Sequence, residues 1–306
     1  MRNTRNGLRT RLNGGATPRS KDWGIDSEYG VLRDVLVGPI EHFIWQPGNA
    51  VSERAERIGL RFDAAVARAQ YHEMLHAYAQ AGVQVHTLSA ERELPYQIFA
   101  RDSSVMTPWG AVIMQMQKPF RRGEYAACQR FYLENDIPIY DMVTAGNVEG
   151  GDFMVLKPGV AICGYSGERS IEPAVHQLKF WFEAEGWEFQ TYAFDSHFLH
   201  LDVQLGMLAE NLVAVCTEAV EPELVAWLTT KGMRIIDVSY GDAMQLGTNV
   251  VALGNERVMI PSSSKHLIAA CRAEGLTVYD PDVSMIAQGG GAVHCMCQAL
   301  RRDSVA

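Results

Sequence analysis

Gly151-Asp-Phe-Met-Val-Leu-Lys-Pro-Gly-Val-Ala-Ile162 has the pattern of two apolar strands around a turn at Pro158-Gly159. Gly and Pro between β-rich runs indicate a hairpin. Residues 169–185 then follow helical spacing, and an apolar strand, Trp187–Tyr192, comes after them. This stretch therefore predicts a hairpin–helix–strand unit. The predicted helix has one apolar face, formed by Ile171, Val175, Leu178 and Phe182.

The same unit occurs four times along the chain. The hairpins are predicted at Ser103–Met114, Gly151–Ile162, Val203–Val215 and Thr248–Ile260. The helices are predicted at 121–135, 169–185, 218–232 and 264–275, and the closing strands at Ile137–Tyr140, Trp187–Tyr192, Met233–Val238 and Leu276–Tyr279. The hairpins start 48, 52 and 45 residues apart, and such a period indicates a circular or stacked repeat.

A fifth unit can be assembled from the two ends of the chain. Val31–Val37, a helix around 61–82 and Val83–Leu88 supply one part, and the segment around Cys295 supplies the missing strands. Pairing the ends closes the ring and removes exposed strand edges. We therefore expect one α/β domain, residues 23–306, with five pseudo-repeats around an axis.

Composition limits the function. The 306 residues are 47% hydrophobic and contain no apolar run of the roughly 18 residues that a membrane-spanning helix needs. Residues 1–22 are basic and poor in apolar residues, which predicts a disordered tail rather than a signal peptide. Removing the six positive charges of this tail from the net charge of −9 leaves about −15. An acidic body favours a small cationic substrate and argues against nucleic acid or a membrane as partner.

The cysteines favour a reducing, cytoplasmic location. Without a secretory signal, free thiols are expected. Four of the six lie singly in apolar or helical stretches: Cys128, Cys163, Cys216 and Cys271. The other two, Cys295 and Cys297, follow the three glycines of Gln288-Gly-Gly-Gly-Ala-Val-His-Cys295.

Three acidic residues precede the first strands of successive hairpins. They are Asp102, Glu149 of Glu-Gly-Gly-Asp152, and Asp202 of His-Leu-Asp. Because equivalent positions of a circular repeat face one axis, we expect these side chains to meet, with Cys295 at the corresponding place in the closing unit. Carboxylates around one pocket repel each other unless a cation lies between them, and a guanidinium pairs bidentately with carboxylates.

The converging residues suit covalent attack on a guanidinium carbon. Cys295 would form a thiouronium adduct, and a positive substrate would favour its thiolate. His200 lies two residues before Asp202, on the same face of an extended strand. It can protonate the leaving amine and then activate a water. The glycines before Cys295 allow close backbone approach or a sharp bend.

Each of these candidate catalytic residues also has a purely structural interpretation. Cys295 could be a buried structural thiol, Asp102 could pair with Arg101, and Glu-Gly-Gly-Asp could be only a tight turn. His197 competes with His200 as the base. His294 is disfavoured, because neighbours in a strand point to opposite faces.

Other chemistries fit less well. His294-Cys295-x-Cys297 could suggest zinc, but Cys-x-Cys is less usual than Cys-x-x-Cys and has no second pair here. The three glycines are not followed by Gly-Lys-Ser/Thr, as a phosphate loop requires. Asp195-Ser196-His197 lacks a nucleophile elbow.

With these motifs, and with Asn255-Glu-Arg-Val-Met-Ile-Pro261, nearly everything after residue 25 resembles the guanidino-group-modifying enzyme superfamily. Its members include arginine and agmatine deiminases, dimethylarginine dimethylaminohydrolases and amidinotransferases. The resemblance implies the five-bladed α/β-propeller (pentein) fold and no metal or organic cofactor. It implies Cys295 as nucleophile, His200 as acid/base, and Asp102, Glu149 and Asp202 as guanidinium ligands.

The resemblance also bears on the substrate. Dimethylarginine hydrolases lack the aspartate of His-x-Asp, so Asp202 favours an unmethylated guanidinium. Family dihydrolases carry Asn at the position of Asp102, which favours a single hydrolysis or a transfer. Arg121 and Arg169 resemble arginines that hold a substrate carboxylate. Tyr96 stands where amino-acid hydrolases have Asp or Asn, which argues against free arginine.

Hydrolysis to a ureido product and ammonia is the preferred prediction. The alternative is amidino transfer from arginine to an amine. The segments Asp26–Gly38 and Leu300-Arg301-Arg302 resemble the corresponding parts of amidinotransferases. A non-catalytic guanidinium-binding pseudoenzyme is a minor alternative. The sequence leaves open the substrate's tail and whether copies of the chain form a homo-oligomer.

Overall fold

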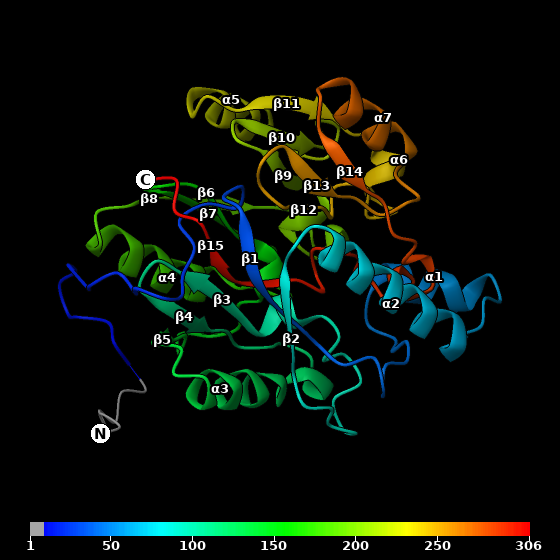
Figure 1. Cartoon of the computed structure of the whole chain (residues 1–306), viewed down its shortest axis with the longest axis horizontal. Helices are drawn as coiled ribbons and strands as arrows, with labels where there is room; N and C mark the ends of the chain where they lie inside the picture. Colours follow the sequence, from blue (N-terminus) through cyan, green and yellow to red (C-terminus); the bar gives the residue numbers. More distant parts are fainter. Residues whose placement is uncertain (1–8) are drawn as a thin grey trace.

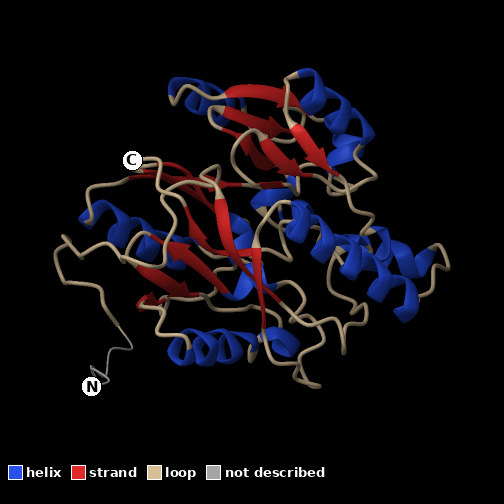
Figure 2. Cartoon of the chain, viewed as in Figure 1, coloured by secondary structure: helices blue, strands red, loops and turns tan. Residues whose placement is uncertain are grey.

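Five three-stranded β-sheets form the frame of the part of the chain, residues 9–306, that this computed structural model describes (Figures 1 and 2). One sheet consists of β3 (Ser104–Thr107), β4 (Gly110–Ile113) and β5 (Ile139–Met142). The next consists of β6 (Phe153–Lys157), β7 (Val160–Tyr165) and β8 (Glu188–Ala193). A third sheet consists of β9 (Leu205–Ala209), β10 (Leu212–Val215) and β11 (Arg234–Asp237). A fourth consists of β12 (Val251–Ala252), β13 (Arg257–Met259) and β14 (Thr277–Tyr279). In each of the four, an antiparallel hairpin is joined by a parallel third strand.

A helix connects each hairpin to its third strand, as predicted. These helices are α3 (Glu124–Glu134), α4 (Glu172–Ala184), α5 (Pro222–Thr230) and α7 (Lys265–Ala273). The apolar periodicity of α4 explains its packing, because Val175, Leu178 and Phe182 are buried on one face. The β6–β7 turn depends on Gly159, whose φ of +80° is readily adopted only by glycine. The predicted units are therefore confirmed, with ends that differ by a few residues.

The two ends of the chain build the fifth sheet, also as predicted. β1 (Leu32–Val37) pairs antiparallel with β15 (Gln298–Arg302) and parallel with β2 (Gln84–Thr87). α2 (Ala64–Gln80) connects β1 to β2. The fold is thus α/β, with one sheet closed by strands from opposite ends of the sequence (Figure 1).

Short 3-10 turns precede the first strands and carry the polar residues of interest. η1 (Ala100–Ser103), η3 (Gly150–Asp152) and η5 (Leu201–Val203) lead towards β3, β6 and β9. η3 contacts both η1 and η5. Segments about 50 residues apart in sequence therefore meet at one point.

The basic N-terminal segment differs from the expectation of a disordered tail over residues 1–22. Residues 1–8 lie outside the described residues, and residues 9–22 make specific contacts with the body. Thr10 and Arg11 donate backbone hydrogen bonds to the carbonyls of Ile139 and Tyr140, and Arg11 pairs with Asp141 at 2.5 Å. Ion pairing with the acidic body holds a segment that its own composition could not fold.

Three short helices were not predicted: α1 (Ala50–Arg57), α6 (Tyr240–Ala243) and α8 (Ser284–Ala287). α1 begins at Asn49, whose side chain accepts the backbone N–H of Ser52 at 2.9 Å. Within residues 9–306, no helix combines the length and apolar character that crossing a membrane would require.

Candidate active site

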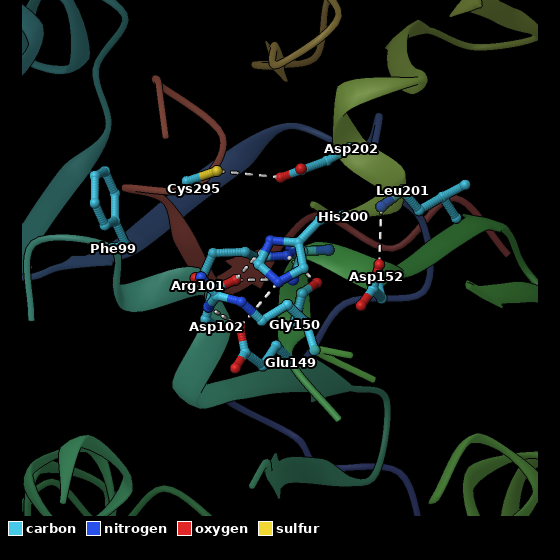
Figure 3. A network of polar contacts seen from close by, with 12 residues as sticks. Phe99, Arg101, Asp102, Glu149, Gly150, Asp152, His200, Leu201, Asp202 and Cys295 are labelled. Atoms are coloured by element: carbon cyan, nitrogen blue, oxygen red, sulfur yellow. Dashed lines mark hydrogen bonds and ion pairs between the residues drawn. The ribbon is translucent and has the colours of Figure 1, made fainter. Parts of the chain in front are cut away.

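The predicted site residues converge where the 3-10 turns η1, η3 and η5 meet. Asp102 lies in η1, Glu149 directly precedes η3, His200 precedes η5, and Asp202 lies within η5. Cys295 lies in the turn before β15, and all five are buried. Figure 3 shows Cys295 and Asp202 facing each other, with the His200 ring beside Asp102 and Glu149.

A glycine allows the turns to pack this closely. A Cβ on Gly151 would lie 2.7 Å from His200 Nδ1 and 3.1 Å from Asp102 Oδ1. The Gly151 backbone N–H also donates to Asp102 Oδ1 at 3.1 Å. Glu-Gly-Gly-Asp is therefore a tight turn as well as part of the site, because its glycine makes room for the imidazole.

His200 is held by its backbone and by carboxylates. The preceding residue, Leu199, has φ 64° and ψ −65°, and the His200 N–H donates to Phe198 O at 2.7 Å, which defines a γ-turn. This conformation is strained for leucine by about 1–3 kcal/mol. The His200 Nε2 lies 2.9 Å from Glu149 Oε2, and Nδ1 lies 3.8 Å from Asp102 Oδ1.

These carboxylates set the charge of the imidazole. Burial lowers the pKa of His200, but Asp102, Asp152 and Glu149 outweigh it and raise the pKa from 6.5 to about 10. Burial likewise raises the pKa of Glu149, but Arg169 and His200 outweigh it and hold the pKa well below its usual value. At neutral pH the pair is therefore imidazolium and carboxylate, ready to donate a proton.

Asp202 contacts the Cys295 thiol and a second histidine. Its Oδ2 lies 3.4 Å from Cys295 Sγ and 2.9 Å from His294 Nδ1. The argument that His294 and Cys295 point to opposite faces of a strand was wrong, because residues 293–296 form a turn. His294 thus reaches the site through Asp202, whereas the other rival, His197, contacts the Tyr240 hydroxyl.

The resting thiol is protonated in this environment. Burial and the carboxylates of Asp202 and Asp102 raise the pKa of Cys295 well above its ordinary value. Burial would raise the pKa of Asp202 too, but the hydrogen bond from His294 and the charges of His294 and His200 together outweigh it and lower the pKa. Asp202 Oδ1 is buried and has no hydrogen-bond partner within residues 9–306. A cationic group between these carboxylates would satisfy Oδ1 and favour the thiolate.

Asn249, which the sequence reasoning missed, organises the loop that carries Cys295. Its Oδ1 accepts the backbone N–H groups of Ala292, His294 and Cys295 at 3.2, 3.0 and 3.3 Å. Its Nδ2 donates to Cys295 Sγ at 3.2 Å. Asn249 stands two residues before β12, as Asp102 stands two residues before β3, so the repeat itself held the signal.

Arg121 and Arg169 line the site but are paired with carboxylates. Arg121 donates to Asp102 at 2.7 Å and forms a two-pronged pair with Glu124 at 3.0 and 2.8 Å. Arg169 donates to Glu149 Oε2 at 3.1 Å. In this conformation both arginines neutralise the carboxylates of the wall.

Arg101 and Asp152 are buried next to the site and bond to residues that flank it. Arg101 pairs with Glu28 at 2.9 Å rather than with the adjacent Asp102, so the structural ion pair considered from sequence is absent. Asp152 accepts hydrogen bonds from Ser170 at 2.5 Å and from the Leu201 N–H at 2.8 Å. Burial raises the pKa of Asp152 to about 7.

The cavity at the nucleophile is nearly closed. Its volume is about 10 Å³, roughly the space of one water molecule. The lining residues are Asn49, Tyr96, Phe99, Asp102, Arg121, Arg169, Leu199, His200, Gly289, Gly290 and Cys295. The Tyr96 hydroxyl lies 3.1 Å from the Gly289 carbonyl, and Asn49 Nδ2 donates to the same carbonyl at 3.0 Å. A substrate must part this wall to reach Cys295.

One cluster in the site has the geometry to hold a metal ion. Asp102, Glu149 and His200 offer ligand atoms within 4.8 Å of one another. However, Arg121 and Arg169 already pair with the two carboxylates, and the raised pKa keeps His200 protonated. A metal would have to displace two guanidinium groups and a proton, so the residues present do not favour one.

Comparison with known proteins identifies the class. Residues 47–302 match the family model for N,N dimethylarginine dimethylhydrolase, eukaryotic. The chain is 27% identical to the uncharacterized protein YkgA of Bacillus subtilis, over 90% of this chain and 94% of YkgA. It is 25% identical to the N(G),N(G)-dimethylarginine dimethylaminohydrolase of Mycobacterium tuberculosis, over 76% of this chain and 75% of that protein.

Solved structures share the fold. A DDAH mutant from Pseudomonas aeruginosa, complexed with citrulline, is 20% identical with a TM-score of 0.74, covering 88% of this chain and 99% of that one. The amidinotransferase SxtG of Microseira wollei is 17% identical with a TM-score of 0.76, covering 92% and 98%. Fold and site together define an enzyme of the guanidino-group-modifying superfamily. Within it, the chain belongs to the N,N dimethylarginine dimethylhydrolase family.

Proposed function

We propose that this protein is a cysteine-dependent hydrolase of a small, unmethylated guanidino compound, which it converts to a ureido product and ammonia. The five sheets would be the blades of a pentein propeller, with the substrate bound on its axis. The observation that carries the proposal is the pairing of Asp202 with the thiol. One carboxylate oxygen lies 3.4 Å from Cys295 Sγ, and the other is buried without a hydrogen-bond partner in residues 9–306.

A guanidinium fits this arrangement. Its N–H groups would bond to Asp202 Oδ1, and to the lone pairs of Asp102 and Glu149 that their pairs with Arg121 and Arg169 leave unused, with its carbon exposed to Sγ. The bound cation offsets the negative field of the carboxylates, so the Cys295 proton is released more readily. The thiolate then attacks the guanidinium carbon.

His200 serves both halves of the reaction. As imidazolium, it donates its proton to the leaving nitrogen, ammonia departs, and the thiouronium adduct remains on Cys295. As neutral imidazole, it accepts a proton from water, and the resulting hydroxide adds to the adduct carbon. Collapse of that intermediate breaks the C–S bond, and its hydroxyl proton passes to the departing sulfur, which releases the ureido product and restores the Cys295 thiol.

The position of Asp202 supports an unmethylated guanidinium. Its carboxylate is buried against Cys295 and His294, where N-methyl groups would need space. Dimethylarginine, the substrate in the family's name, is therefore a poorer fit than an unmethylated compound.

The experiment compares substrates and products by mass spectrometry. Purified enzyme is incubated with arginine, agmatine, dimethylarginine and short guanidino acids, with and without amines such as glycine, ornithine or lysine. A ureido product with ammonia, formed without an amine, supports the hydrolase. A product formed only with the amine and carrying its amidino group makes the protein an amidinotransferase. Retained activity in Cys295→Ser would contradict covalent catalysis by this thiol.

A further inference from the structure

A second pocket lies beside the nearly closed catalytic cavity and, unlike it, has no carboxylate in its lining. Its volume is about 290 Å³. The residues lining it are Ala50, Val51, Arg54, Arg57, His197, Met244, Gln245, Leu246, Ser263, Ser284, Ala287 and Gln288. In Figure 1, α1, which carries Arg54 and Arg57, and α6, which directly precedes Met244, both lie on the right of the view.

The pocket carries positive charge and no carboxylate. Arg54 and Arg57 line it, whereas none of its lining residues is Asp or Glu, although the whole chain has a net charge of −9. Among residues 9–306, neither arginine lies within 4.0 Å of a carboxylate or makes a side-chain hydrogen bond within the protein. By contrast, Arg121 and Arg169 in the catalytic cavity are both paired with acidic side chains.

The sequence of α1 directs these arginines to one face. Ala50, Arg54 and Arg57 follow the i, i+4, i+7 spacing of a single helix face, and all three line the pocket. Glu53 and Glu56 fall between them in sequence and do not line it. Ala287, Met244 and Leu246 add apolar surface, so the pocket suits an anionic group on a short apolar stem.

Three chain segments pass from one cavity to the other. Asn49 and Gly289 line the catalytic cavity, and their neighbours Ala50 and Gln288 line the pocket. Leu199 lines the catalytic cavity, and His197 lines the pocket. The hydrogen bond from Asn49 Nδ2 to the Gly289 carbonyl lies in the wall between them. Parting this contact would join the cavity that holds Asp102 and Cys295 to the pocket that Arg54 and Arg57 line.

We propose that this pocket is the subsite for the tail of the substrate, and that the substrate is an ω-guanidino acid. The inference rests on the proposed function, since it requires a guanidinium held at Asp202. The carboxylates of the catalytic cavity bind the cationic end, while Arg54 and Arg57 bind the acid end by charge-assisted hydrogen bonds. A molecule with opposite charges at its two ends matches both cavities at once.

The test is equilibrium binding, so that it does not depend on turnover. A Cys295→Ala full-length protein is titrated calorimetrically with ω-guanidino acids of increasing chain length, and with alkylguanidines of the same lengths. At one chain length the acid should bind more tightly than its alkylguanidine. Arg54→Gln and Arg57→Gln should each weaken acid binding about 10-fold, the size of one hydrogen bond to a charged group. Neither substitution should change alkylguanidine binding.

Arg61→Gln is the matched control, because Arg61 is exposed just beyond α1 and does not line the pocket. It should leave both kinds of ligand unaffected. Equal binding of acids and alkylguanidines, or an equal loss in the Arg61 variant, overturns the tail subsite and leaves the guanidinium site intact. Failure of both ligand series to bind overturns the proposed function and this inference with it. Circular dichroism of each variant confirms that the fold is retained.

Discussion

Replacing Asn249 separates the two functions of its side chain. Asn249→Ala removes the acceptor of three backbone N–H groups in the loop that carries Cys295, and the donor to Cys295 Sγ. Asn249→Asp keeps a carboxylate oxygen for the N–H groups but replaces the donor with a negative charge. Loop architecture should therefore fail only in the alanine variant, whereas thiolate stabilisation should fail in both.

The magnitudes follow from these contacts. Three buried N–H groups lose their acceptor in Asn249→Ala, at about 1–3 kcal/mol each before relaxation, so the free energy of unfolding should fall by about 3 kcal/mol or more. A hydrogen bond to a charged group contributes about 1.5–3 kcal/mol, and the weakness of sulfur as an acceptor favours the lower end. At about 1.4 kcal/mol per pH unit, the pKa of Cys295 should rise by about 1 in Asn249→Ala and further in Asn249→Asp.

Alkylation by iodoacetamide across a pH series measures this pKa. Peptide mass spectrometry assigns the reaction to Cys295 among the six cysteines, and urea unfolding gives the stability. If both variants alkylate Cys295 with the pH dependence of the unaltered protein, then Asn249 does not stabilise the thiolate and the reasoning is refuted. Equal stability of the alanine and aspartate variants would separately contradict its role as acceptor.

Substitutions at three further positions test other parts of the site. Asp202→Ala should weaken guanidinium binding by about 3–5 kcal/mol, because a buried cation loses its partner; titration in a Cys295→Ala background measures this, and unchanged affinity would remove Asp202 from the site. His200 has a pKa raised from 6.5 to about 10, so the stability that it contributes is fully present below pH 6.5 and is lost as the pH rises through 10. The stability of the unaltered protein relative to His200→Gln should therefore fall across that interval, and a constant difference in unfolding free energy would contradict the shift. Leu199→Gly should be more stable than Leu199→Ala by about 1 kcal/mol, the reverse of the usual order, because only glycine relieves the positive φ; chemical denaturation of the two variants decides.

The repeat made much of the fold predictable from sequence. Hairpin turns such as Pro158-Gly159 and the apolar face of α4 are local signals, so the units and their order could be inferred. Pseudo-symmetry then indicated that Asp102, Asp202 and Cys295 meet. This step succeeded because the turns that precede the first strands of successive hairpins contact one another.

What sequence reasoning missed depends on contacts between distant segments. Asn249 acts through hydrogen bonds to a loop more than 40 residues away, and no local pattern reports such bonds. His294 was set aside because its segment was taken as a strand. The packing of residues 9–22 depends on acidic partners such as Asp141, which composition cannot place.

The sheet formed by β1, β2 and β15 has a consequence for how the protein acquires its reactive thiol. β15 follows Cys295 directly and pairs with β1, which lies more than 260 residues earlier. During synthesis, β1 must therefore wait unpaired on that edge until nearly the whole chain has emerged. Closing so long a loop costs conformational entropy and slows folding. Cys295 is thus the last of the predicted site residues to be made, and it docks onto carboxylates and a histidine that are already in the chain.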